Sequence, residues 1–369
     1  MRRLLQRLIP GTRVTPESER PVAAPGKKLI NLALQGGGAH GAFTWGVLDH
    51  LLDDGRLQIE GISGASAGAV NAILLADGLA RGGPEEARRR LADFWRAASA
   101  GGSLSTVQQG VIERLFSFLP IDNTPAQLWF KAMSRYFSPY ALNPLNINPL
   151  KSLIEGFVDF EAVRACPGLQ LFISATNVYT GRLHVFSRDK MTADVIAASA
   201  CLPFLFQAVE IDGVPYWDGG YLGNPPIFPL FHTTTTEDVL IVQLNPLERR
   251  MTPTTSREIV NRLNEITFNS SLLSEIRAIE FVARLIDQQA LPHGTGPGQY
   301  RKVKLHRIVL DGLGKSYTAD TKLSTDFDFF EGLRASGRRA ARRFLDNHFD
   351  DINVRSTIDL STESQAEWA

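Results

Sequence analysis

Two stretches near the start of the chain repeat one pattern, a short apolar run followed by a glycine-containing turn and a helical segment. Residues 27–34 form the first run after a polar start, and a helical pattern covers residues 39–54. Residues 58–62 form the second run, and a helix of small residues covers 69–81. Short apolar runs predict buried strands, and strand–turn–helix units in series predict parallel strands covered by helices.

Apolar runs and helical patterns continue through the rest of the chain. Gly82, Gly83 and Pro84 separate the helix at 69–81 from another helical pattern at 85–98. Further strands are predicted at 169–176, 239–244 and 302–310, and residues 182–186 could pair with the first of these. Long helices are predicted at 258–289 and 327–348. Because no linker divides the chain and no internal repeat is present, we expect one α/β domain with an inserted segment.

The turn after the second predicted strand reads Gly64-Ala65-Ser66-Ala67-Gly68, which is a G-x-S-x-G sequence. A serine nucleophile on a strained strand-to-helix turn needs this context, because side chains two positions before and after it would collide with the turn. The following helix would also bring its N-terminal N–H groups toward the serine. A glycine-rich turn without chemistry is the alternative, but the flanking strand and helix favour Ser66 as a nucleophile.

The turn after the first predicted strand, residues 36–41, has the sequence Gly-Gly-Gly-Ala-His-Gly and allows two interpretations. As G-x-G-x-x-G it could bind a dinucleotide, with Glu60 placed for the ribose. As a glycine-rich loop beside a nucleophile, it could aim backbone N–H groups at a developing negative charge. The G-x-S-x-G turn favours the second interpretation, because successive parallel strands would place the two turns side by side.

A serine nucleophile needs a base that takes its proton. The seven histidines are His40, His50, His184, His232, His293, His306 and His348. None of them follows a late strand as a triad histidine would. His40 begins a predicted helix, and His184 lies inside a predicted strand, where a structural role is more common.

A carboxylate is the other candidate for the base. Asp218 ends an aromatic-flanked strand and is followed by Gly219 and Gly220, which allow another loop to approach closely. Asn224 could fix this loop by hydrogen bonds. An Asp-Gly hairpin turn is nevertheless the more frequent meaning of such a sequence, so spacing alone does not select Asp218.

Together these three segments resemble the patatin-like phospholipase family. That family carries a glycine-rich loop, a G-x-S-x-G turn and a later Asp-Gly-Gly or Asp-Gly-Ala in this order. Residues 197–206 are similar to its Ala-Ser…Pro…Phe stretch, and residues 224–226 are similar to its Asn-x-Pro. The resemblance covers about residues 28–230, with one departure at His40, where plant patatins carry arginine. Ser199 lacks the glycine turn and is therefore no rival nucleophile.

The resemblance implies a three-layer α/β/α patatin-like fold with a mainly parallel central sheet, and a serine acyl hydrolase with a Ser66–Asp218 dyad. The implied oxyanion hole consists of Gly36, Gly37, Gly38 and Ala39, and the implied supports of the turns are Gly64, Gly68, Gly219, Gly220 and Asn224. No metal or organic cofactor is implied, and the chain has no calcium-binding loop of the Asp-x-Asp-x-Asp-Gly type.

Three functions are consistent with the sequence. The first is a lipid acyl hydrolase, such as a phospholipase A or esterase. The second is a depolymerase of polyhydroxyalkanoate or another polyester on the same fold and dyad, which only a substrate assay separates from the first. The third is a non-catalytic lipid-binding scaffold, which the intact Ser66, Asp218 and glycine loop disfavour.

We expect a flexible basic tail at residues 1–26, a catalytic domain at 27–250, and a mainly helical C-terminal region at 251–369 packed on the same domain. An aromatic-rich insert at 104–150 has no simple period. Its side chains could line an acyl-chain pocket or a lid facing lipid, with Trp129, Phe130, Phe137 and Tyr140 as the lining residues. Ordinary core packing explains the same residues equally well.

The composition limits which classes of binding partner and which cellular compartment we expect for this protein. The 369 residues hold 39 Lys plus Arg and 39 Asp plus Glu, and this balance gives no support for nucleic-acid binding. Two cysteines, Cys166 and Cys201, cannot form a disulfide framework. Arg7 and Pro10 interrupt the apolar N-terminus, so no signal peptide is predicted. We expect a cytoplasmic protein, with peripheral membrane contact through the arginines of the tail as an alternative to simple disorder there.

Overall fold

The computed structural model describes residues 23–99, 138–249, 252–294, 298–310 and 326–359. Most of the basic tail and of the aromatic-rich insert, including Trp129, Phe130 and Phe137, lies outside these residues. The expected division of the chain into a catalytic domain and a C-terminal region stays a prediction.

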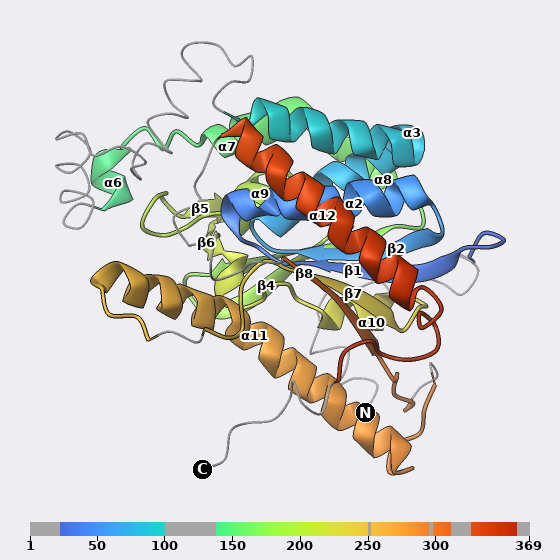
Figure 1. Cartoon of the computed structure of the whole chain (residues 1–369). Coiled ribbons are helices and arrows are strands. Elements are labelled where there is room, and N and C mark those ends of the chain that lie inside the picture. Colours follow the sequence, from blue (N-terminus) through green and yellow to red (C-terminus); the bar gives the residue numbers. More distant parts are fainter. Residues whose placement is uncertain (1–22, 100–137, 250–251, 295–297, 311–325, 360–369) are drawn as a thin grey trace.

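One eight-stranded sheet forms the centre of the molecule (Figure 1). Its strands are β1 (Lys28–Leu34), β2 (Leu57–Gly64), β3 (Gln170–Asn177), β4 (Arg182–Ser187), β5 (Val209–Ile211), β6 (Val214–Asp218), β7 (Asp238–Gln243) and β8 (Lys304–Val309). The order is β5-β6-β3-β2-β1-β7-β8, with β4 also paired to β3. Strands β8, β7, β1, β2 and β3 run parallel, whereas β4 and β6 are antiparallel to β3. The sheet is therefore mixed and mainly parallel, as the sequence predicted.

Both faces of the sheet are buried, because successive residues of a strand point to opposite faces. In β1, Leu32 and Leu34 belong to one apolar core and Ala33 to the other. The first core lies under α2 (Gly41–Asp54), α3 (Ala67–Ala97), α7 (Pro149–Phe157), α8 (Phe160–Ala165), α9 (Ala193–Ser199) and α12 (Phe327–His348). The second core lies under α10 (Phe228–Thr233) and α11 (Ser256–Asp287), on the other face of the sheet (Figure 1). Helix, sheet and helix thus form the three expected layers.

The two helices predicted at 69–81 and 85–98 are one bent element, α3. Gly83 has φ 75° and ψ −157°, which interrupts the helical backbone just before Pro84. Glycine adopts this left-handed φ without a clash, and proline is tolerated there as the start of a new helical turn. Within the described residues, no helix combines the length and the apolar character that crossing a bilayer requires.

Helices α2 and α12 touch through their backbones. A Cβ added to Gly46 would lie 2.0 Å from the carbonyl oxygen of Arg334, so only glycine fits at this crossing. The close approach brings two arginines of α12 to the buried Asp49 of α2. Its carboxylate accepts hydrogen bonds from Arg88 at 2.8 Å, Arg334 at 2.9 Å and Arg338 at 2.6 Å. Asp49 therefore joins three helices of this layer.

Replacing Asp49 by asparagine is expected to lower the free energy of unfolding by about 3 kcal/mol, because three guanidinium groups lose a buried carboxylate. Burial by itself raises the pKa of Asp49, but hydrogen bonds from Arg88, Arg338 and Arg334 bring that pKa below its ordinary value. The stabilisation is thus present at neutral pH and is lost as the pH falls through the lowered pKa. Urea unfolding measures both effects. Asp93→Asn, at a more exposed ion pair with Arg89, should cost less than about 1 kcal/mol; equal losses would contradict this role.

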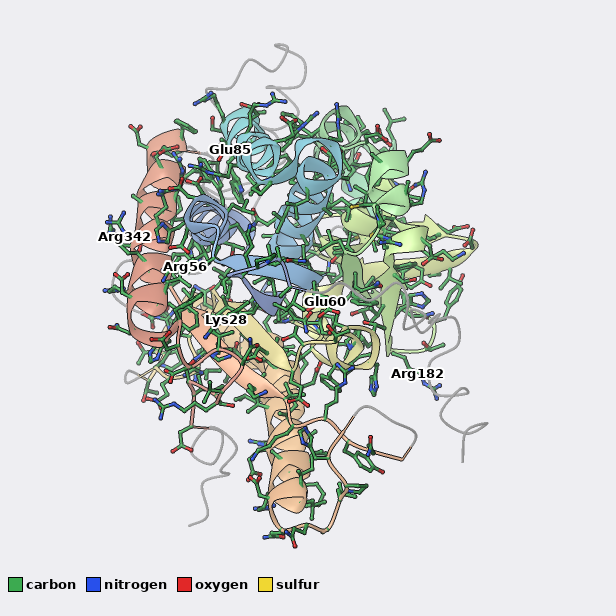
Figure 2. The ribbon with its side chains drawn as sticks, turned by 90° about the vertical axis from the view of Figure 1, so that its right-hand side faces the viewer. Lys28, Arg56, Glu60, Glu85, Arg182 and Arg342 are labelled. Carbon is green, nitrogen blue, oxygen red and sulfur yellow. The ribbon has the colours of Figure 1, made fainter. Side chains whose placement is uncertain are left out.

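Strands β1, β2 and β3 end at the same edge of the sheet, on the left in Figure 1. Figure 2 views the molecule from the opposite edge, where β1 and β2 begin. There Lys28 and Arg56 lie 4.7 and 4.4 Å from the ring centre of Phe349, which follows α12. Charged and aromatic side chains thus close the starting edge, and the glycine-rich turns gather at the other.

Candidate active site

Ser66 occupies a sharp turn between β2 and α3. Its φ of 52° and ψ of −122° are strained for a residue with a side chain. A Cβ on Gly64 would lie 2.7 Å from the carbonyl carbon of Gly68, and a Cβ on Gly68 would lie 2.0 Å from the carbonyl oxygen of Leu34. Both glycines are therefore required by backbone contacts, and the turn has the strained geometry that the G-x-S-x-G sequence predicted.

Helix α9 supports this turn from behind. The backbone N–H of Ser66 donates a hydrogen bond to Ser199 Oγ at 3.0 Å, and the Ser199 side chain is fully buried. A buried hydroxyl that holds a turn is not exposed to a substrate, which agrees with the prediction that Ser199 is no rival nucleophile. The supporting contact itself could not be predicted from the sequence, since α9 lies far from the turn along the chain.

The glycine-rich loop lies directly beside Ser66. A Cβ on Gly36 would be 2.8 Å from Ser66 Cβ, so the two turns are in contact, as expected for successive parallel strands. The N–H of Gly36 donates to Asn224 Oδ1 at 2.6 Å. This amide is therefore already occupied, and Gly36 does not serve as one of the expected oxyanion donors. Gly38 has a positive φ of 59° and begins the short turn that leads into α2.

Asp218 lies beside the same edge of β3 as the serine turn. Gly64 of β2 pairs with Ile173 of β3, and Ala175, two residues further along β3, pairs with Asp218 of β6. Because β4 occupies the other edge of β3 along residues 172–177, β6 takes the edge that β2 leaves where its chain turns at Ser66. Sheet pairing thus brings the predicted serine and aspartate to neighbouring positions beside β3.

The backbone around Asp218 is fixed by close contacts. Asp218 Oδ1 accepts the N–H of Gly220 at 2.6 Å, and Thr176 Oγ1 donates to the carbonyl oxygen of Asp218 at 2.8 Å. A Cβ on Gly219 would lie 2.2 Å from the carbonyl oxygen of Ser174, so the loop packs against β3 as closely as glycine allows. The aspartate side chain is 1% exposed.

Two neutral groups accompany this carboxylate. Burial raises the pKa of the Cys201 thiol to about 12, with a further contribution from the negative charge of Asp218. The pKa of Tyr221 is also raised to about 12, first by burial and then by Asp218. Both groups stay protonated at neutral pH, and Tyr221 packs its ring 5.2 Å from that of Phe268 in α11. Asp218 is therefore buried beside a neutral thiol and a neutral phenol.

A buried amide network behind the glycine loop was missed by the sequence analysis. Gln35 Oε1 accepts the N–H groups of Leu244 at 2.7 Å and Asn245 at 2.8 Å, and Gln35 Nε2 donates to Asn269 Oδ1 at 2.9 Å. Asn245 Nδ2 donates to the carbonyl oxygen of Gly36 at 2.8 Å. The signal that could have indicated these positions is a polar residue at the end of a buried strand: Gln35 directly follows β1, and Asn245 is the second residue after β7.

Asn224 links the same loop to α11. Besides accepting from Gly36, its side chain donates to the carbonyl oxygen of Phe268 at 3.2 Å, and its backbone N–H donates to Ser271 Oγ at 3.2 Å. The expected role of Asn224 as a support is thus given a definite geometry. It holds the glycine loop and the start of the α10 segment against one helix.

Several histidines have structural partners away from Ser66. His40 is buried and lies against Phe329 of α12, with ring centres 6.4 Å apart. His184 packs against Phe186 in β4, with ring centres 4.3 Å apart. His306 Nε2 lies 2.9 Å from Asp238 Oδ1, but Asp238 begins β7 and is at the edge opposite to the serine turn. This histidine–aspartate pair therefore cannot serve Ser66.

The carboxylate that a dinucleotide-binding site would need for the ribose is engaged elsewhere. Glu60, near the start of β2 (Figure 2), accepts the N–H groups of Thr235 and Thr236 and the hydroxyl of Thr235. It is buried between strands and cannot reach a ribose at the glycine loop. Among the described residues, no group of three or more His, Cys, Asp or Glu side chains is arranged to hold a metal ion.

Solved structures similar to this chain share low sequence identity with it. VipD from Legionella pneumophila is 16% identical, over 88% of this chain and 68% of that one, with a TM-score of 0.40. Human GIVD cytosolic phospholipase A2, solved with methyl gamma-linolenyl fluorophosphonate, is 13% identical over 94% of this chain and 60% of that one, with a TM-score of 0.41. The type III effector protein ExoU is 15% identical over 88% of this chain and 54% of that one, with a TM-score of 0.32.

No curated protein sequence matches the chain. The model of the patatin-like phospholipase family matches residues 32–231, which is more than half of the 369 residues. The matched range contains the glycine loop, the serine turn, Asp218 and Asn224. By this match, the chain belongs to the patatin-like phospholipase family.

Proposed function

We propose that the chain is a serine acyl hydrolase that cleaves carboxylic ester bonds of lipids, with Ser66 as the nucleophile and Asp218 as its base. The observation that carries this proposal is the strained turn of Ser66, in contact with the glycine loop and next to Asp218 along one edge of β3. A strained turn at a helix N-terminus is costly to fold, and such strain gathers at functional sites.

In the first half of the reaction, Ser66 Oγ attacks the ester carbonyl carbon while its proton passes to the carboxylate of Asp218. The tetrahedral intermediate collapses when the bond from carbon to the leaving oxygen breaks. Asp218 returns its proton to that oxygen, so an alcohol leaves and an acyl group remains on Ser66. In the second half, water repeats the sequence, and the fatty acid leaves as Ser66 regains its proton.

The developing negative charge requires donors beside Ser66. Because the amide of Gly36 is occupied by Asn224, the proposed donors are the backbone N–H groups of Gly37, Gly38 and Ala39. The N-terminus of α3 begins at Ala67, directly after the nucleophile, and adds its positive dipole end. The oxyanion hole is thus proposed as a feature of the backbone rather than of side chains.

The experiment that tests this function follows hydrolysis of p-nitrophenyl esters of increasing acyl length, with Ser66→Ala and Asp218→Asn run alongside. Phospholipid and polyhydroxybutyrate are then compared as substrates, because only the substrate separates a lipid hydrolase from a polyester depolymerase. Release of fatty acid from phospholipid supports the proposal, whereas activity on the polyester alone would overturn its substrate class. Absence of all hydrolysis would favour a lipid-binding scaffold.

Asn224→Ala is expected to lower kcat for ester hydrolysis by about 10- to 100-fold, with a smaller change in KM. Its side chain fixes the N–H of Gly36 and so the position of the oxyanion donors that follow, and small misplacements of such groups cost about this much. Steady-state kinetics separate the two constants. Asn347→Ala, at an exposed position of α12, is the matched control. An equal loss in both variants, or a change in KM alone, would contradict a positioning role.

A further inference from the structure

The N-terminal half of α11 exposes a row of apolar side chains. Ile259, Val260, Leu263 and Ile266 are each between 43% and 57% exposed. The opposite side of these turns is buried against the body of the protein, through Glu265 and Asn269. Large apolar side chains that gather on one side of a surface helix are uncommon on a protein that meets only water.

The hydroxyl groups on the same side of the helix are already hydrogen-bonded within the helix. Thr267, Ser270 and Ser274 are exposed there, and each hydroxyl donates to a carbonyl oxygen of the preceding turn, at 2.8, 2.8 and 2.9 Å. Hydroxyl groups satisfied within their own helix are compatible with an apolar surrounding.

Among the described side chains of this half, the charged ones have partners away from the apolar row. Arg262 pairs with the buried Glu265 at 3.3 Å, and Glu258 accepts the N–H of Thr255 at the start of the helix. The exposed apolar side chains therefore cover about two turns, and hydroxyl groups bonded within the helix follow over the next two.

These turns of α11 also touch the candidate active site. Phe268 packs on Tyr221, its carbonyl oxygen accepts from Asn224, and Asn269 bonds to Gln35. The apolar row thus lies on the outer side of the helical turns whose inner side supports the glycine loop. The row is therefore separated from the glycine loop by the width of one helix, about 10 Å.

A second apolar group borders the site from another direction. Its members, which are between 45% and 83% exposed, are Tyr140, Leu145, Ile147 and Phe204. Phe204 belongs to the loop after Cys201, whose carbonyl oxygen accepts the N–H of Asp218 at 2.8 Å. Gln207 Nε2 donates to the carbonyl oxygen of Asn143 at 2.6 Å and so ties this loop to the segment of α6 (Pro139–Leu142).

The two groups lie on one side of the molecule. In Figure 1, α6 and the gold N-terminal end of α11 are both on the left, at the edge where the parallel strands end. The first group lies on the helix that supports the glycine loop, and the second includes Phe204 in the loop that follows Cys201, the hydrogen-bond partner of the Asp218 N–H. We name the eight exposed side chains of the two groups the apolar rim.

We propose that the apolar rim rests on a lipid–water interface, so that an acyl ester reaches Ser66 from the lipid phase. This inference rests on the proposed function and adds that aggregated lipid, rather than dispersed ester, is the substrate form. A protein partner spanning both groups would cover the candidate site, whereas a lipid surface supplies the substrate there. Burial of several such side chains in an interface gives reversible binding without net charge.

Co-sedimentation with sonicated phosphatidylcholine vesicles tests the inference. The full chain carrying Ser66→Ala is used, so that the lipid is not consumed during the measurement. We expect this protein to bind, with little difference between low and high salt because the contact is apolar. Adding Leu263→Glu and Ile266→Glu should reduce the bound fraction about tenfold or more, since two charges replace two apolar contacts.

Phe281→Glu is the matched control. Phe281 is 52% exposed on the same helix, 18 residues beyond Leu263, which is roughly 27 Å along the axis. Its replacement should leave vesicle binding unchanged. Circular dichroism and thermal unfolding check that each variant is folded, and Leu263→Ser with Ile266→Ser replaces the glutamate pair if that pair unfolds.

Three outcomes overturn the inference: equal binding by the Leu263/Ile266 variant, equal losses in that variant and in Phe281→Glu, or no binding by the starting protein. A dimer that the Leu263/Ile266 variant dissociates would instead assign the rim to a second copy of the chain. Vesicle binding does not require catalysis, so its failure is distinct from a failure of ester hydrolysis. If the protein binds vesicles but hydrolyses no ester, the proposed function is rejected, whereas the contact of the apolar rim with a lipid surface is retained.

Discussion

Replacing Ser66 by alanine is expected to lower kcat/KM for p-nitrophenyl ester hydrolysis by at least about 10⁴-fold. The proposed acyl-enzyme forms on Ser66 Oγ, and among the described residues no other serine or threonine has a positive φ. Ser199 is fully buried and its Oγ already accepts the N–H of Ser66. Activity that survives the substitution could therefore come only from oriented water at the oxyanion hole. Ser152→Ala, at an exposed position of α7, is the control for a simple serine deletion.

Because the backbone at Ser66 is strained, the stability of Ser66 variants tests the turn independently of their activity. Alanine keeps the φ of 52° unfavourable, whereas glycine adopts such angles readily. Ser66→Gly should therefore be inactive and also more stable than Ser66→Ala, by about 1 kcal/mol in urea unfolding. Equal stability of the two variants would mean that the turn is not strained. Full activity in Ser66→Ala would remove the nucleophile assignment itself.

Replacing Asp218 by asparagine is expected to lower kcat by about 10³- to 10⁴-fold, with KM little changed. An asparagine can keep the hydrogen bond from the Gly220 N–H, since its Oδ1 can take the place of the carboxylate oxygen. It cannot accept the serine proton. The comparison therefore removes the base while it preserves the size and the main contact of the side chain.

Asp212→Asn is the control for this aspartate. Asp212 lies in the exposed turn between β5 and β6, close in sequence to Asp218, and has a positive φ that asparagine tolerates. Its hydrolysis rate should match that of the unmodified chain. If Asp218→Asn keeps most of its activity, the proton must go to another group, and a dyad of Ser66 with Asp218 would be rejected.

Local chemistry determined much of the serine turn. Gly64 is required because the backbone of Gly68, four residues on in the same turn, occupies the space of any Cβ, whereas Gly68 is required by a contact with Leu34 of the neighbouring β1. The alternation of strands and helices was readable for the same reason, since apolar period and glycine position are properties of short segments. The parallel centre of the sheet followed from that order.

Contacts between distant segments decided the rest. Asp218 belongs to an ordinary Asp-Gly pattern, and only the resemblance selected it in advance. In the fold, β6 pairs with the edge of β3 that β2 leaves, and this brings Asp218 next to the turn of Ser66. Gln35 and Asn269 became functional candidates only when α11 packed beneath the glycine loop. The amide of Gly36 was expected at the oxyanion and is instead held by Asn224.

The physical reason for this division is the range of the interactions. Sterics of the backbone act within a few residues, so the sequence by itself determines where a strained serine can stand. Buried hydrogen bonds join whichever polar groups the fold brings within about 3 Å of each other. The distance between two such groups along the chain therefore does not indicate whether they will pair. For this chain, the sequence determined the turn of Ser66 and the order of strands and helices along the chain. The tertiary structure decided which amides and which carboxylate surround that turn, and that an uncharged helix surface borders it.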